Sequence, residues 1–111
     1  MPIDRQWIEA WFFRLDQGLR HEAINDLRTA TEEEVVRLNR VQTERAKEFA
    51  RIILEIYAFL ITGQERDDLE QRFQQAQELE RQLRELEEAA DRARRDLEAF
   101  EHVVRFVNRM R

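Results

Sequence analysis

The stretch of residues 64–110, QERDDLEQRFQQAQELERQLRELEEAADRARRDLEAFEHVVRFVNRM, decides the fold because its pattern is that of one long helix. It contains no glycine and no proline, and most of its residues are strong helix formers. Its apolar residues recur at steps of four and three, the spacing of a seam buried against a neighbouring helix. The seam consists of Leu69, Phe73, Ala76, Leu79, Leu83, Leu86, Ala90, Ala93, Leu97, Phe100, Val104 and Val107.

A helix of this length does not fit inside a compact fold. At a rise of about 1.5 Å per residue, residues 64–110 would span roughly 70 Å. A compact domain of similar size has a radius of gyration of only about 13 Å. The sequence therefore predicts an elongated molecule.

The preceding segment supplies a partner for the long helix. Thr31 and Glu34 have the spacing of a capping box, which predicts a helix over residues 32–62. Gly63 is expected to end this helix, and the link around it is short. The next helix, over residues 65–110, must then run back antiparallel to the first. The sequence thus predicts a coiled-coil-like helical hairpin.

The short link also sets the register of this hairpin. Phe49 would lie near Ala76, and Leu38 near Glu88 or Ala90. The helix over residues 32–62 is shorter than its partner. Past the level of residue 32, the helix over residues 65–110 would therefore continue unpaired for about 25 Å.

The N-terminal residues predict two further helices, over residues 4–17 and 19–28. Asp4 can cap the first, and Gly18 is expected to end it. Because the first helix is apolar on one face, we expect it to dock on the C-terminal end of the long helix. This docking would join Trp7, Trp11 and Phe12 to Phe100, Val104 and Val107.

The predicted fold class is therefore all-α, an elongated antiparallel hairpin with a docked N-terminal helix. The 111 residues are enough for one domain, covering residues 1–111, and too few for two. Charged residues make up 39% and apolar residues 42% of the chain, which is typical of a helical, coiled-coil-like protein.

The composition also bounds the location and chemistry of the protein. Cysteine is absent, so we expect no disulfide, no thiolate nucleophile and no cysteine-based metal site. No N-terminal targeting signal is visible, and the most apolar run, residues 52–61, is too short to span a bilayer. We therefore expect a soluble, cytoplasmic protein that does not enter membranes.

No pattern in the sequence indicates catalysis or a cofactor. There is no glycine-rich phosphate loop and no nucleophile elbow, and each carboxylate has an arginine or lysine within one helical turn. Glu98 and His102 lie one turn apart, but two ligands do not make a metal site, and His21 lies far away in sequence. We expect no enzymatic activity, no metal and no cofactor.

More apolar surface is present than a two-helix hairpin can bury. Ile52, Ile53, Ile56 and Leu60 can face the long helix, whereas other apolar residues of this segment point elsewhere. Such surplus usually marks a partner surface, so we predict a homodimer or higher homo-oligomer. The alternative is that residues 19–31 fold back over the patch. The residues predicted to form interfaces are Trp7, Trp11, Phe12, Phe13, Leu54, Tyr57, Ile61 and Phe106.

These observations predict a non-enzymatic helical protein–protein interaction module. It would be a self-associating scaffold, assembly factor or small regulatory subunit that binds a protein partner by helix packing. The alternative is a nucleic-acid-associated regulator that uses Arg105, Arg109 and Arg111 at the end of a helical dimer. The net charge of −5 argues against nucleic-acid binding, and arginines in a last turn also complement the helix dipole.

Overall fold

The computed structural model describes residues 2–110, and within them it contains three helices and no strand. Helix α1 spans Arg5–Arg14, α2 spans Gln17–Thr62 and α3 spans Leu69–Arg109. The molecule measures 70 × 29 × 17 Å and has a radius of gyration of 22.6 Å. The predicted all-α, elongated architecture is therefore confirmed.

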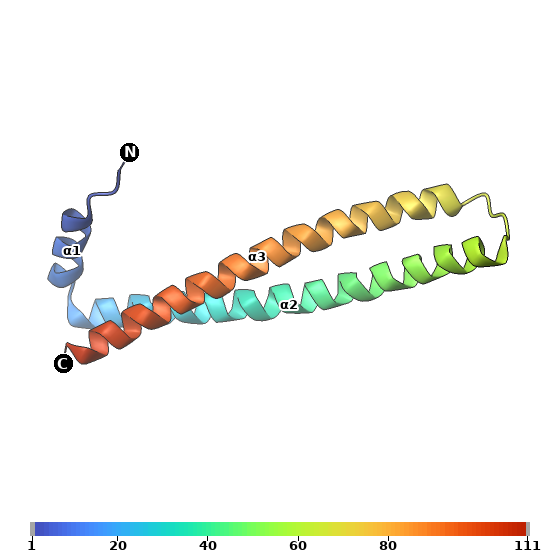
Figure 1. Ribbon diagram of the computed structural model, residues 1–111. Coiled ribbons are helices and arrows are strands. Elements are labelled where there is room, and N and C mark those ends of the chain that lie inside the picture. Colours follow the sequence, from blue (N-terminus) through green and yellow to red (C-terminus); the bar gives the residue numbers. More distant parts are fainter. Residues whose placement is uncertain (1, 111) are drawn as a thin grey trace.

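Helices α2 and α3 lie side by side and run in opposite directions (Figure 1). Two clusters of buried side chains join them along their length. In one, Leu38 of α2 packs against Ala90 and Ala93 of α3. In the other, nearer the turn, Ile52 packs against Ala76 and Leu79, with Phe49 and Ile56 beside them. In both clusters a large side chain of α2 thus packs against at least one alanine of α3.

The turn between these helices begins with a C-terminal cap at Gly63. Its φ of 65° places this glycine in the left-handed region. The Gly63 N–H donates to the Leu60 carbonyl at 3.4 Å, and the Gln64 N–H donates to the Phe59 carbonyl at 3.2 Å. These two bonds form a Schellman motif, which satisfies carbonyls that a helix end otherwise leaves unpaired. The connection then runs through residues 63–68 before α3 begins.

Gly63→Ala is expected to destabilise the protein by about 1 kcal/mol, because a side chain disfavours the left-handed conformation. The chain's only other glycine, Gly18, provides the control. Gly18 lies in a helix at negative φ, where alanine is favoured over glycine, and its added Cβ would lie 3.1 Å from Asp16 Oδ2, a side-chain atom that need give by only a few tenths of an ångström. Gly18→Ala should therefore cost less stability than Gly63→Ala. Urea unfolding of both variants tests this, and equal losses of stability would contradict the cap assignment.

Helix α2 is longer than predicted, and the expected break before residue 32 is wrong. The predicted helices over residues 19–28 and 32–62 are one continuous helix. The Thr31 hydroxyl does not cap a helix start; it donates to the Leu27 carbonyl one turn earlier at 2.7 Å. The Glu34 carboxylate pairs with Arg37, at 2.6 Å, instead of reaching back to a free backbone N–H.

The first helix ends earlier than predicted, and Gly18 does not end it. Helix α1 stops at Arg14, and Asp16 caps the start of α2. One oxygen of the Asp16 carboxylate accepts hydrogen bonds from the backbone N–H groups of Gly18 and Leu19, at 3.0 and 3.3 Å. Gly18 therefore lies in the first turn of α2.

The structure does not show the expected docking of the first helix on α3. The extension of α2 takes that place: its His21 and Ile24 line a small cavity together with Val104 and Val107 of α3. Because α2 already covers the end of α3, α1 projects away from the pair and none of its residues is buried (Figure 1).

Candidate interaction surfaces

The end of α2 next to the turn carries five large apolar side chains that are exposed, and we call them the turn-end stripe. Their exposed fractions run from 42% to 68%. They cover a side of α2 turned away from the buried Ile52, which faces α3. The stripe consists of Ile53, Leu54, Tyr57, Leu60 and Ile61. Ile53 and Leu60 were expected to face α3, but the helix presents them to solvent.

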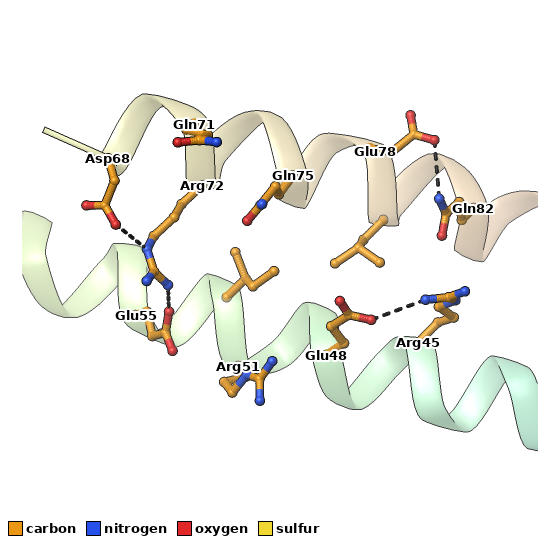
Figure 2. A pocket seen from close by; sticks show the side chains of 12 residues that line it. Arg45, Glu48, Arg51, Glu55, Asp68, Gln71, Arg72, Gln75, Glu78 and Gln82 are labelled. Atoms are coloured by element: carbon orange, nitrogen blue, oxygen red, sulfur yellow. Dashed lines mark hydrogen bonds and ion pairs between the residues drawn. The ribbon is translucent and has the colours of Figure 1, made fainter.

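The opposite side of the two helices near the turn is polar. An open groove runs between α2 and α3 there, and Ile52 and Leu79 contribute to its lining (Figure 2). Arg72 of α3 bridges two carboxylates, Glu55 of α2 and Asp68 at the start of α3, the latter at 2.9 Å. This ion-pair network ties the two helices together at the turn.

Phe73 shows how sharply these two sides differ. It follows Arg72 directly, and about 100° of helical rotation separates the two side chains. Arg72 points into the polar groove (Figure 2), whereas Phe73 is an exposed aromatic residue on the other side of the seam residues Leu69 and Ala76. The prediction that Phe73 lies in the buried seam is therefore wrong, because its side chain is 53% exposed.

Helix α1 carries a second apolar surface at the other end of the molecule (Figure 1). Trp7 and Trp11 lie with ring centroids 6.1 Å apart, and both are about half exposed. Phe13 is exposed as well, and so is Phe106 near the end of α3. We call Trp7 and Trp11 the α1 aromatic surface, because Phe13 lies about 160° round the helix from Trp11.

Phe12 differs from its aromatic neighbours because α2 partly covers it. The Arg20 guanidinium lies 5.0 Å from the centre of the Phe12 ring, and its Nη1 donates to the Phe12 carbonyl at 3.2 Å. The Phe13 ring meets Phe12 edge-on at 5.4 Å. Phe12 thus packs against Arg20 at the bend between α1 and α2. The sequence pattern did not predict this contact.

Many of the charged side chains form exposed ion pairs, such as Arg37 with Glu34 and Arg94 with Asp91. Among residues 2–110, no charged or polar side chain is buried. Where a pKa departs from its ordinary value, an exposed pair is the cause. Hydrogen bonds from Arg81, and secondarily from Gln82, lower the pKa of the Glu78 carboxyl, and a hydrogen bond from Arg37 lowers that of Glu34. Both carboxyls therefore stay ionised at neutral pH, as acceptors of these hydrogen bonds.

The candidate metal and nucleic-acid residues Glu98, His102, Arg105 and Arg109 are exposed along the last turns of α3. Within the described part of the chain, no group of three potential ligands gathers around Glu98 and His102 or elsewhere. Arg105 pairs with Glu101 at 3.9 Å. Arg111 lies outside the described residues. Across residues 2–110, no helix has both the length and the apolar character that crossing a membrane requires.

Fold and surfaces together define the class: an elongated all-α protein with exposed apolar surfaces at both ends. No protein-family model, no curated protein and no solved structure matches this chain.

Proposed function

We propose that the protein is a non-enzymatic helical interaction module that self-associates through the turn-end stripe. In this proposal α2 and α3 act as an antiparallel, coiled-coil-like hairpin. The α1 aromatic surface is left to bind a protein partner. The protein would then work as a scaffold, assembly factor or small regulatory subunit.

The exposure of the turn-end stripe carries this proposal. Five large apolar side chains without a charge among them lie together on one side of α2. Taking a large apolar side chain from full exposure to full burial is worth roughly 1.5–3 kcal/mol, and covering these partly exposed side chains would gain about half of that each. Contiguous exposed apolar patches are rare on monomeric proteins and usually mark an interaction site. Self-association is the simplest way to cover such a surface, since it needs only a second copy of the chain.

The hairpin part of the proposal is supported by two separate clusters along the seam. Leu38 packs against Ala90 and Ala93, and Ile52 packs against Ala76 and Leu79. Polar contacts across the seam add to them: Arg72 pairs with Glu55, and Arg94 Nη2 donates to Asn39 Oδ1 at 2.8 Å. A rigid rod of this kind can hold two binding surfaces at a fixed separation.

The α1 aromatic surface supports the partner-binding part of the proposal. Tryptophan is enriched among the residues that dominate binding energy at protein interfaces. The surface lies at the opposite end of a 70 Å molecule from the turn (Figure 1). A second copy at the turn-end stripe would therefore leave it accessible, so one dimer would display two such surfaces.

Sedimentation equilibrium of the full chain tests the self-association. We expect a molecular mass of twice the 13.6 kDa of one chain at micromolar concentration, falling toward 13.6 kDa on dilution. The dilution series gives the dissociation constant directly. A mass of 13.6 kDa at every concentration up to the millimolar range would contradict the proposal.

A further inference from the structure

We propose that the partner at the turn-end stripe is a second copy packed antiparallel, α2 against α2, with Tyr57 at the two-fold axis. This inference rests on the proposed self-association and adds its geometry. It follows from the order of side chains in the stripe and from the charges at the two ends of the stripe.

The stripe is symmetric about Tyr57 in both spacing and residue type. The sequence of residues 53–61 is ILEIYAFLI. Isoleucines stand four residues to either side of Tyr57, and leucines stand three residues to either side. In a dimer with two-fold symmetry, one surface patch must be complementary to itself. An antiparallel pairing centred on Tyr57 places Ile53 against the partner's Ile61, and Leu54 against the partner's Leu60. Every large side chain of the stripe then meets another one.

The charges at the two ends of the stripe favour the same orientation. Residues 44–51 carry three basic and two acidic side chains, whereas residues 65–70 carry one basic and four acidic ones. Among residues 2–110, Lys47 and Arg51 form no ion pair with another side chain, and neither do Glu65 and Asp67. The basic end of the stripe and the acidic turn therefore keep unpaired charges of opposite sign.

An antiparallel partner brings these charges together. Lys47 lies ten residues before Tyr57, or about 15 Å along the helix. The same distance on the far side of the axis reaches the partner's turn, where Glu65 and Asp67 lie. A parallel partner would instead place Lys47 beside the partner's Lys47, and Arg51 beside the partner's Arg51. Like charges placed side by side disfavour that arrangement.

A charge-reversal pair tests the orientation. One variant carries Lys47→Glu and Arg51→Glu, and the other carries Glu65→Lys and Asp67→Lys. Each variant alone places like charges at both ends of the antiparallel interface, so each should dimerise at least about tenfold more weakly than the wild type. Mixed at equal concentration, the two variants restore opposite charges at both ends. The mixture should therefore form a heterodimer with a dissociation constant near the wild-type value.

Asp96→Lys together with Glu98→Lys is the matched control. Both residues are exposed on α3 far from the turn, so this double reversal should leave the dissociation constant unchanged. Far-UV circular dichroism verifies that every variant remains helical. The antiparallel geometry is overturned if the single variants and the mixture all dimerise like the wild type. It is also overturned if the mixture does not regain the wild-type dissociation constant. In either case self-association itself stands. If the wild-type chain stays monomeric, the proposed function itself is contradicted.

Disulfide trapping gives a second readout that does not depend on charge. The chain has no cysteine, so any disulfide must form between the introduced cysteines. Under mild oxidation, an equimolar mixture of Leu54→Cys and Leu60→Cys should form mainly the mixed disulfide. Predominant cross-linking of each variant to itself would indicate parallel packing and overturn the inference.

Discussion

Leu38→Ala is expected to lower the free energy of unfolding by about 2–5 kcal/mol, the usual cost of truncating a well-packed leucine. Leu38 is only 4% exposed and packs against Ala90 and Ala93 of α3. Those alanines have no side-chain length with which to fill the space that is left. The substitution therefore removes buried apolar contacts and leaves a cavity between the helices.

Leu27→Ala is the matched control for this change. It makes the same chemical substitution in the same helix, but at a side chain that is half exposed. Urea unfolding followed by circular dichroism compares the two variants. Both must be measured at one protein concentration, because dimerisation makes stability depend on concentration. Equal losses for the two variants would mean that the α2–α3 seam does not hold the fold together.

The double substitution Leu54→Glu and Ile61→Glu is expected to abolish self-association. Both side chains are about two-thirds exposed in the single chain, so the helix should tolerate the change. In a dimer, however, the two glutamates would be buried without a partner, and an unpaired buried charge costs several kcal/mol. The variant should sediment at 13.6 kDa at concentrations where the wild type has twice that mass.

Gln71→Glu together with Gln75→Glu controls for the added charge. These glutamines line the polar groove on the other side of the helix pair (Figure 2). The control changes the net charge by the same amount without touching the stripe, so it should leave the mass doubled. Loss of self-association in both variants would point to net charge, and not to the stripe, as the cause.

Most of the buried face of α3 could be predicted from the sequence because its apolar residues recur at steps of four and three, with one extra three-residue step between Ala76 and Leu79. Phe73 is the exception, since it belongs to the predicted seam but is exposed. The seam residues Ala76, Leu79, Ala90, Ala93 and Val107 are all buried, and no glycine or proline interrupts the helix. The exact bounds of the helix could not be predicted. The connection after Gly63 uses residues 63–68, so α3 begins at Leu69 and not near residue 65.

The start of α2 was mispredicted because local capping signals compete with helix continuation. The capping-box spacing of Thr31 and Glu34 is real, but both side chains also have partners inside a helix. Nothing between residues 19 and 32 forces a break, so the helix continues. The cap that is used, Asp16, precedes Gly18, and a glycine in the first turn is hard to distinguish from one that ends a helix.

The sequence indicates which segments carry surplus apolar residues, but not which of these side chains face α3 and which face solvent. The surplus of apolar residues near Tyr57 was evident from composition, but which of them face α3 depends on the angle at which the helices pack. Ile53 and Leu60 are therefore exposed against expectation. Phe12 is covered by Arg20, a contact that depends on how the chain bends between α1 and α2. The role of all these residues as an interface stays a prediction.

Fluorine NMR of the protein labelled with 3-fluorotyrosine tests the central claim most directly. Tyr57 is the only tyrosine in the chain, so it gives one assigned signal at the centre of the turn-end stripe. The account predicts that this signal shifts on dilution, with the same midpoint as the fall in mass from dimer to monomer. A signal that stays unchanged while the mass halves would place the interface elsewhere and contradict the account.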